Sequence, residues 1–272
     1  MQDFSTSPKE IIASFWRNRS LIKSLVQREI IGRYRGSVFG ILWSLFNPIL
    51  MLTVYTFVFS IVFRAKWSTG SDSKIEFALV LFAGLIIFNL FAESISRSSS
   101  LILNNVNYVK KVVFPLEILP WINLGAATFH FAISLGVWLL TYFLFYGLPY
   151  LTVFLLPLII IPFLLLILGL TYFLSALGVY LRDISQLIGL IITIMLFMSP
   201  IFYPISSLPV EFHGVFMLNP LTPIIEMTRN ILYFGHAPKY DLLMMYYFFS
   251  ILVLWIGFVW FQKTRKGFSD VL

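Results

Sequence analysis

The chain contains no cysteine and very few charged residues. Of its 272 residues, 59% are hydrophobic and only 11% are charged, and the mean hydropathy is +0.91. The lack of cysteine excludes disulfides, thiolate metal sites and cysteine nucleophiles. A chain this apolar cannot bury its hydrophobic surface in a water-soluble globule. We therefore expect a membrane protein, whose net charge of +7 reflects its topology rather than nucleic-acid binding.

Long uncharged runs predict six membrane-spanning helices. A helix needs about 20 apolar residues to cross ~30 Å of hydrocarbon. Between Glu117 and Arg182 lie 64 residues without Asp, Glu, Lys or Arg, which is enough for two helices joined by a turn at 146–150. Pro48 is expected to kink the first span. We predict an all-α polytopic membrane protein with spans at about 37–63, 77–103, 117–146, 151–180, 184–203 and 241–262.

The region between the fifth and sixth predicted spans is apolar but broken. The stretch 212–225 is too short to span a membrane and contains Gly214, Pro220 and Pro223. It predicts a re-entrant helical pair on the outer side. Glu226 and Arg229 in this region either control an exit or simply pair on the outer surface, and the sequence does not separate these readings.

Residues 1–36 predict a cytoplasmic interface helix ahead of the permease domain at 37–262. Residues 7–10 fit a capping box with proline at the first helical position. Farther on, the apolar residues Ile22, Leu25 and Ile30 share one face of a helix that also carries several basic residues. This pattern is typical of a basic amphipathic helix lying in the membrane interface. Residues 263–272 are expected to form a cytoplasmic tail.

The distribution of Lys and Arg predicts the orientation. Six spans place both termini on one side, where thirteen of these residues fall, whereas five fall on the other side. Cytoplasmic loops carry an excess of Lys and Arg. Both termini are therefore expected in the cytoplasm of a cell with this chain in its inner (plasma) membrane.

Four groups of motifs occur in order along the chain. They are Gln27–Ile30 with Arg33–Ser37, Gly40–Trp43 and Asn47–Pro48; Lys110–Pro120; Tyr180–Ile184; and Ser199–Pro204. Together they resemble the membrane subunits of bacterial type 2 ATP-binding-cassette exporters, specifically the polysaccharide branch that exports O-antigen, capsule and teichoic acid.

This resemblance implies a homodimer whose two copies line one channel for a lipid-linked glycan, with two separate cytoplasmic ATPase subunits attached. The chain has no GxxxxGK[ST] phosphate-binding loop, in agreement with a separate ATPase. ATP and Mg would be bound by that partner. No cofactor, metal or catalytic residue is expected in this chain, so it is interpreted as a non-catalytic transport subunit.

The segment between spans two and three corresponds, by the resemblance, to a coupling helix that docks into the ATPase. An ordinary basic inner loop is the alternative. The charged pair between spans four and five is a further contact candidate, or only a membrane anchor. The candidate ATPase-coupling residues are Asn107, Tyr108, Lys110, Lys111, Phe114, Pro115, Glu117, Arg182 and Asp183.

Polar and aromatic residues in the spans suggest a channel wall. Glu93 and Arg97 stand four residues apart in span two, so they should face protein or water and can pair with each other. They either contact the sugar or phosphate of a substrate or form a structural ion pair. Aromatic rings could let a glycan slide by stacking, although most aromatic residues of membrane proteins face lipid. The candidate channel-lining residues are Phe39, Trp43, Phe46, Tyr55, Phe59, Glu93, Arg97, Phe202 and Tyr203.

The basic segment before span one is a candidate entrance for the lipid carrier, because arginine binds phosphate well. Attraction to bulk anionic lipid is an equally good explanation of its charge. The candidate entrance residues are Arg28, Arg33, Tyr34 and Arg35.

Three other functions fit parts of the sequence less well. An exporter of the same fold for small lipids or drugs is the main alternative. An ion-coupled secondary transporter is disfavoured, because such proteins place coupling acids at mid-span and show internal repeats. His236 and Asp241 match the HxxxxD spacing of some acyltransferases, but they do so without companion motifs. His130 and His213 are scattered and predict no metal site.

Overall fold

The structure is a computed structural model that describes residues 5–62, 67, 74–110 and 114–272. The described part is helical and contains no strand. Its α-helices are α1 (Pro8–Arg17), α2 (Arg19–Arg33), α3 (Trp43–Tyr55), α4 (Lys74–Ser98), α5 (Val106–Lys110), α6 (Leu119–Tyr146), α7 (Leu156–Tyr180), α8 (Ile184–Phe197), α9 (Val210–Leu218), α10 (Leu221–Arg229), α11 (Tyr240–Thr264) and α12 (Phe268–Val271).

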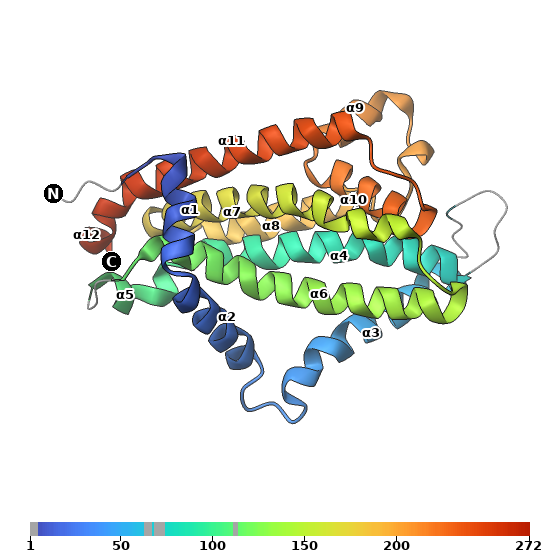
Figure 1. Cartoon of the computed structure of the whole chain (residues 1–272), viewed down its shortest axis with the longest axis horizontal. Coiled ribbons are helices and arrows are strands. Elements are labelled where there is room, and N and C mark those ends of the chain that lie inside the picture. The colour runs from blue at the N-terminus through green and yellow to red at the C-terminus, as the bar shows by residue number, and fades with distance from the viewer. Residues whose placement is uncertain (1–4, 63–66, 68–73, 111–113) are drawn as a thin grey trace.

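Long helices run side by side and form one elongated bundle (Figure 1). Within the described residues, five helices are long and apolar enough to cross a membrane: Gly40–Phe59, Ile75–Ser98, Leu116–Tyr146, Leu151–Tyr180 and Tyr240–Val271. The prediction of an all-α polytopic membrane protein is therefore confirmed. The sixth apolar helix, α8, has 14 residues, so it rises only about 21 Å. The count of six spans remains a prediction.

Helix α4 forms the centre of the bundle. It packs against α6, α7, α8 and α10, and 83% of its most apolar window is buried. Trp138 of α6 donates its indole N–H to the carbonyl of Leu79, at 2.8 Å, and Asn123 donates to the carbonyl of Ser94, also at 2.8 Å. These bonds satisfy buried polar groups that would be costly to leave unpaired among apolar helices.

Helices α7 and α11 pack against each other along their length. Two glycines make this close approach possible. A Cβ on Gly169 would lie 2.6 Å from the Cα of Leu254, and a Cβ on Gly257 would lie 2.1 Å from the carbonyl oxygen of Gly169. Small residues at such positions let two backbones meet, as is common between membrane helices.

Two ends of the bundle can be distinguished. The α5 end carries α1, α5 and α12, and the α10 end carries α9 and α10 (Figure 1). Helices α9 and α10 are separated by Asn219 and Pro220, so this apolar region folds as two short helices. Whether they form a re-entrant pair within the membrane stays a prediction.

Several helix boundaries differ from the predicted spans. Helix α4 ends at Ser98 rather than near 103, because turns and a 3₁₀ segment at Leu103–Asn105 follow it. Helix α8 ends at Phe197, three residues before Pro200, since proline disfavours the helical conformation of the residue before it. The predicted turn between the third and fourth spans is present, with Gly147 at a φ of +82°.

The amino-terminal segment contains two helices rather than one, with a break at Asn18. Helix α1 begins at Pro8 as predicted, and Ser7 caps it by accepting a 3.3 Å hydrogen bond from the N–H of Lys9. The side chain of Glu10 does not complete the capping box; it pairs with Arg17 at 2.7 Å. Helix α1 crosses the α5 end of the bundle, and α2 turns away from it (Figure 1).

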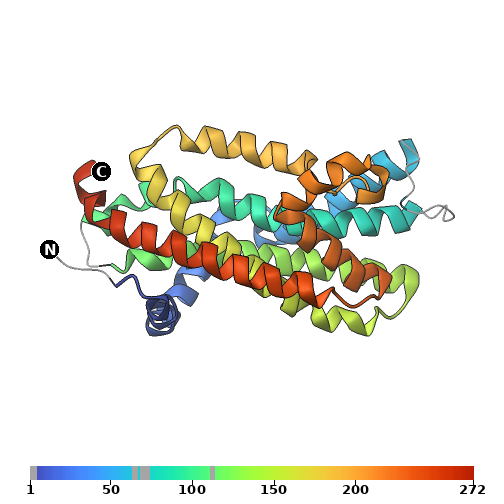
Figure 2. The same cartoon turned by 90° about the horizontal axis from the view of Figure 1, so that it is seen from above.

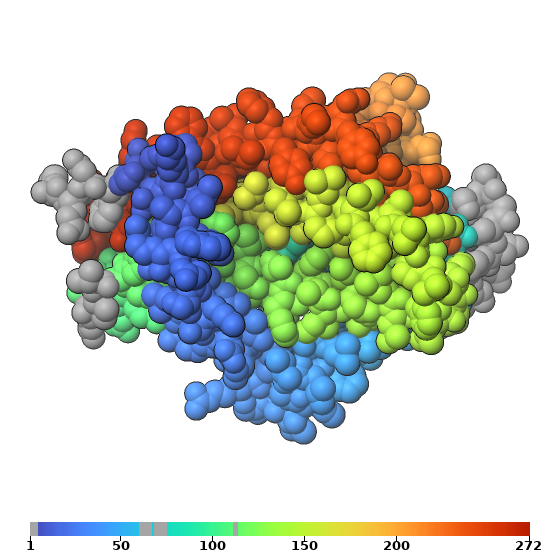
Figure 3. All heavy atoms as spheres, viewed as in Figure 1, coloured from blue at the N-terminus to red at the C-terminus, as the bar shows by residue number. Residues whose placement is uncertain are grey.

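Helices α2 and α3 meet at a corner that projects from the bundle (Figures 1 and 3). Gly36 and Gly40 take φ values of +84° and +52° there, which other residues rarely adopt. Only 6% of the most apolar window in Gly40–Phe59 is buried. Helix α8 lies along one edge of the bundle (Figure 2) and exposes apolar side chains such as Leu190 and Ile194.

Candidate functional site

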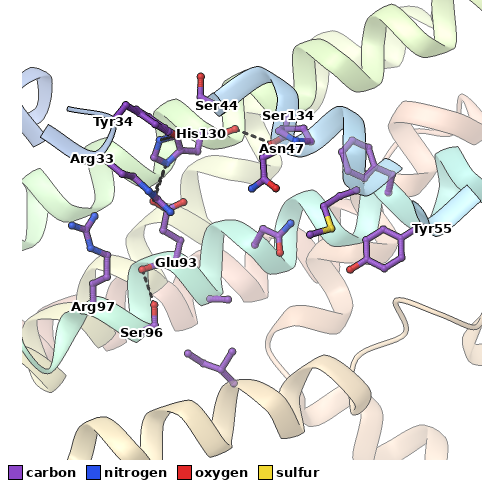
Figure 4. Close-up of a pocket in the computed structure, with 16 residues that line it drawn as sticks. Arg33, Tyr34, Ser44, Asn47, Tyr55, Glu93, Ser96, Arg97, His130 and Ser134 are labelled. Atoms are coloured by element: carbon purple, nitrogen blue, oxygen red, sulfur yellow. Dashed lines mark hydrogen bonds and ion pairs between the residues drawn. The ribbon is translucent and has the colours of Figure 1, made fainter. Parts of the chain in front are cut away.

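A cavity of about 530 Å³ lies between the α2–α3 corner and helices α4 and α6. Polar side chains from all four of these segments surround it (Figure 4). Its lining is Arg33, Tyr34, Ser44, Asn47, Pro48, Met51, Tyr55, Phe82, Asn89, Ala92, Glu93, Ser96, Arg97, His130, Ser134 and Ile192. The cavity thus brings together two of the candidate entrance residues with three of the candidate channel residues.

Two reciprocal ion pairs join α2 to α4. Arg33 pairs with Glu93, and Glu29 pairs with Arg97. On each helix the two partners are four residues apart and so share a face. The pairing order reverses between the helices, so that the acid of each helix meets the base of the other. Glu93 and Arg97, which the sequence allowed to pair with each other, each pair with a residue of α2 instead.

His130 of α6 connects this ion-pair cluster to Tyr34. Its Nδ1 lies 2.8 Å from a carboxylate oxygen of Glu93 and 3.2 Å from the Arg33 guanidinium, and the shorter contact, to a group that can only accept, favours a proton on Nδ1. In the neutral imidazole Nε2 then accepts from the Tyr34 hydroxyl, at 3.1 Å. Burial raises the pKa of Tyr34 above its ordinary value, which keeps this hydroxyl protonated. A connected hydrogen-bond chain of this kind fixes the orientation of each member.

The carboxylate of Glu93 and the guanidinium groups of Arg33 and Arg97 differ in exposure. The side chains of Glu93 and His130 are 18% and 14% exposed, whereas those of Arg33 and Arg97 are 47% and 41% exposed. The carboxylate therefore lies behind the guanidinium groups. Of the charged side chains that line the cavity, the two guanidinium groups are the more accessible, and such groups suit a phosphate or another anion.

Uncharged polar side chains extend the wall of the cavity along the bundle. Asn47 of α3, Asn89 of α4 and Ser134 of α6 all line it. These residues were not predicted from the sequence, in which His130 looked isolated. Side-chain amides inside otherwise apolar spans were the available signal, because such groups tend to face protein or water rather than lipid.

The predicted aromatic channel residues separate into two groups. Phe39, Trp43 and Phe46 contact one another at centroid distances of 5.6 to 6.4 Å and are partly exposed outside the cavity. Only Tyr55 lines the cavity itself. One helical turn farther on, Phe59 stacks on Phe202 with a centroid distance of 5.3 Å and an interplanar angle of 21°.

Tyr203 closes the turn that follows α8. Its hydroxyl donates a 2.6 Å hydrogen bond to the carbonyl of Phe197, the last residue of that helix. It also contacts Phe216 of α9 edge-on, at 6.1 Å between centroids. Tyr203 and Phe202 are both partly buried at the α10 end of the bundle and outside the cavity lining.

Most candidate coupling residues lie at the α5 end. Asn107 and Lys110 are exposed on α5, and Tyr108 stacks on Phe114 with ring centroids 4.2 Å apart. Pro115 follows directly and is half-buried, and Arg182 and Asp183 are exposed at the turn between α7 and α8. Lys111 lies outside the described residues.

Two candidates of this region contact unexpected partners. Glu117 is only 7% exposed and forms an ion pair with Arg265 at 2.6 Å, so its carboxylate faces inward rather than toward a docking partner. Arg28, predicted at the entrance, donates a 2.8 Å hydrogen bond to the Tyr108 hydroxyl. Arg35 is exposed near the α2–α3 corner.

A smaller cavity of about 190 Å³ lies beside the first one, between α2 and the α5 ends of α4 and α6. Arg97 lines both cavities. Arg28, Asn104 and Asn123 add further donors to the smaller one. Within the ranges that the structure describes, no group of three or more His, Asp or Glu side chains is placed to hold a metal ion.

Arg229 lies at the opposite end of the bundle and is almost wholly buried, with 1% of its surface exposed. It contacts Glu226 at 3.1 Å and also several backbone carbonyls. The two residues do pair, as one of the two sequence readings had it, but Arg229 is buried inside the bundle rather than on its surface.

Comparison with known proteins gives a consistent result. A sequence model of the family described as ABC-2 type transporter matches residues 20–233, which is more than half of the chain. The O-antigen export system permease protein RfbA of Myxococcus xanthus is 30% identical over 262 residues, covering 96% of this chain and 98% of that protein. Two proteins of the same description from Klebsiella pneumoniae are each 28% identical, over 93% of this chain and 95% of each relative.

Proposed function

The chain belongs to the ABC-2 type transporter family, and from this premise we propose that it is the membrane subunit of an ATP-driven exporter of lipid-linked polysaccharide. The glycan is of the O-antigen, capsule or teichoic-acid type and moves outward from the cytoplasmic side. The observation that carries the proposal is the cavity at the α2–α3 corner, with Arg33 and Arg97 on its wall, in a chain similar to O-antigen export permeases over nearly its whole length.

The arginines of the cavity would receive the phosphate of the lipid carrier. Arg33 and Arg97 are held by Glu93 and Glu29, yet both guanidinium groups remain partly exposed. A phosphate offers several acceptor oxygens and can replace a carboxylate as the partner of a guanidinium. Arg28 and Arg35 extend the positive charge along α2 toward the membrane interface.

The remaining cavity wall suits a sugar chain. Asn47, Asn89, Ser96 and Ser134 can exchange hydrogen bonds with hydroxyl groups, and Tyr55 offers a ring face for stacking. Such contacts are individually weak and do not depend on one sugar sequence. They favour sliding of a glycan over tight binding at one position.

Two copies of the chain would enclose the channel. The first span is largely uncovered in a single chain, and α8 exposes several large apolar side chains. A contiguous apolar surface at such a position is a common sign of a protein interface. A second copy facing α3 and α8 would close the open side of the cavity, and the outer aromatic residues Phe39, Trp43 and Phe46 would then lie near the contact between copies.

The motor would be a pair of separate ATPase subunits that bind ATP and Mg and dock at the α5 end. Asn107, Lys110, Arg182 and Asp183 are exposed there, and Lys111 belongs to the same segment of sequence. This end would face the cytoplasm of a bacterial cell, with the chain in its inner membrane. The excess of Lys and Arg at the predicted cytoplasmic segments supports this orientation.

Transport in vesicles tests the proposal. The chain would be co-expressed with the ATPase from its own operon, purified as a complex and reconstituted with a lipid-linked glycan. We expect transport that requires ATP and that falls at least about tenfold in Arg33→Gln and Arg97→Gln, because each loses a charge-assisted contact. Arg19→Gln, which removes an exposed arginine outside the cavity, is the matched control.

Two results of the vesicle experiment would contradict this proposal. Transport driven by an ion gradient in vesicles without any ATPase subunit would overturn the proposal. Equal transport of small amphipathic drugs and of the glycan would favour an exporter of the same fold with a different substrate.

A further inference from the structure

The chain bends sharply after α8, at Met198–Ile201, and the backbone carbonyls of this bend need partners. Helix α8 ends at Phe197, and Pro200 prevents its continuation. Carbonyl groups at and beyond a helix end lack intrahelical donors and carry partial negative charge. In a bundle whose surroundings are apolar, these groups must be satisfied from other elements.

The two ends of α10 supply the donors. Asn219, just before this helix, donates from its side-chain amide to the carbonyl of Met198 at 3.1 Å and to the hydroxyl of Ser199 at 2.9 Å. Arg229, the last residue of the helix, donates to the carbonyl of Ile201 at 2.7 Å and to the carbonyl of Pro200. The bend is thus held at four consecutive residues by the two ends of one helix.

Arg229 is also anchored to the centre of the bundle. Its Nε donates to the carbonyl of Val80 in α4 at 2.9 Å, and its guanidinium lies 4.3 Å from the ring centroid of Trp67. Gly84 of α4 leaves the space, because a Cβ there would lie 2.7 Å from a terminal nitrogen of Arg229. Burying an arginine is costly unless its donors are satisfied. Here each of the three guanidinium nitrogens donates to a backbone carbonyl.

The bend determines where the next aromatic residue lies. Phe202 follows Ile201 directly and stacks on Phe59, which itself follows Tyr55 of the cavity wall by one helical turn. The contact between Phe59 and Phe202 therefore lies just beyond the cavity, on the side toward the α10 end of the bundle. A bend that moved freely would not hold Phe202 in this position.

We propose that Asn219 and Arg229 are positioning residues that use α10 as a bracket to hold the Met198–Ile201 bend, and with it Phe202, at the outer end of the transport path. The proposal rests on the proposed function only in assuming that a glycan passes Phe202 during transport. The bracket itself is a property of the single chain and can be tested without substrate or ATPase.

Cysteine labelling of the full-length chain tests the bracket, because the native sequence has no cysteine. Ile201→Cys places a thiol in the bend at a position that is fully buried. We expect its labelling by a water-soluble maleimide to be slow, and to become at least about tenfold faster when Arg229→Lys or Asn219→Leu removes donors to the bend. Lysine keeps the charge of Arg229 but cannot reach several carbonyls with one planar group.

Two controls separate a released bend from general unfolding. Ile167→Cys, buried in α7, should remain slow to label in both bracket variants. Lys239→Met removes an exposed cation near the same end and should leave the labelling of Cys at 201 unchanged. Should Arg229→Lys fail to fold, Asn219→Leu keeps the arginine and still removes one end of the bracket.

Unchanged labelling at position 201 in both bracket variants would overturn the proposal, as would equal acceleration at 167 and 201. Faster labelling at 201 alone supports it. This outcome does not depend on transport. If the bracket is confirmed in a chain that moves no glycan, the bracket stands and the proposed function fails. If the chain moves glycan but labelling at 201 is unchanged in the bracket variants, the proposed function stands and the bracket fails.

Discussion

The carboxylate of Glu117 accepts a 2.6 Å hydrogen bond from the guanidinium of Arg265, although 148 residues separate them. Its other oxygen accepts from the hydroxyl of Ser14 in α1 at 3.2 Å. The backbone carbonyl of the same residue accepts from the Tyr172 hydroxyl in α7 at 2.7 Å. Glu117, in the short 3₁₀ segment before α6, thus connects the amino-terminal helix, the middle of the bundle and the segment after α11.

Breaking this ion pair should destabilise the protein strongly. The side chains of Arg265 and Glu117 are 12% and 10% exposed, so Arg265→Gln leaves a buried carboxylate without its cation. We expect a loss of about 3–5 kcal/mol in unfolding free energy, measured by denaturant unfolding in detergent. Arg17→Gln removes the exposed partner of Glu10 and should cost less than about 1 kcal/mol. Equal losses would contradict the assigned role of burial.

Exchanging the charges of one reciprocal pair should separate stability from transport. Arg97→Glu places two carboxylates opposite each other and should lower the unfolding free energy by about 1 kcal/mol. Adding Glu29→Arg restores opposite charges and should recover most of that loss. Transport of the glycan should stay low in the double variant, because the arginine now projects from α2 rather than from α4. Recovery of both properties would show that Arg97 acts only through its ion pair.

Alanine at the α7–α11 contact should be poorly tolerated. The atoms that a Cβ on Gly169 or Gly257 would meet belong to the backbone, so the helices must move apart. We expect Gly169→Ala and Gly257→Ala to lower the thermal midpoint and to cost about 1–3 kcal/mol each. Gly136→Ala in α6, where a Cβ meets nothing within 4 Å, should be within about 0.5 kcal/mol of the parent chain.

A second copy on α3 can be detected by single-cysteine crosslinking in membranes. Val54→Cys lies on α3 outside the cavity lining, and its parent side chain is 51% exposed. We expect oxidation to give a crosslinked dimer from this variant. Leu144→Cys on α6, whose parent side chain is 68% exposed, should remain monomeric. Crosslinking at 144 but not at 54 would place the interface on another face.

The sequence predicted the helices because their signal is local. Runs of apolar residues between charges located the five long helices, and Gly147 marked a turn that the structure contains. The ends of α4 and α8 were placed too far along the chain. The segments that follow Ser98 and Phe197 are uncharged, so they were included in the predicted spans, although their backbones are no longer helical.

Partners from distant helices could not be read from the same signal. The spacing of Glu93 and Arg97 allowed a pair within one helix, whereas the actual partners come from the amphipathic helix α2, 60 and 68 residues earlier. His130 looked isolated because its neighbours Tyr34 and Glu93 are distant in sequence. Arg229 looked like a surface residue for a related reason: apart from Glu226, its acceptors are backbone carbonyls, which the side-chain sequence does not reveal.

The corner between α2 and α3 has one further consequence. Among the residues that the structure describes, a Cβ on Gly36 or Gly40 would meet nothing within 4 Å, so these glycines are needed for the backbone conformation and not for close packing. The backbone hydrogen bonds of this corner are short-range ones, such as that from the N–H of Ser37 to the carbonyl of Tyr34 at 3.2 Å. A change in the angle between the two helices is therefore opposed by the contacts of Arg33 with Glu93 and of Tyr34 with His130, and not by the glycines of the corner.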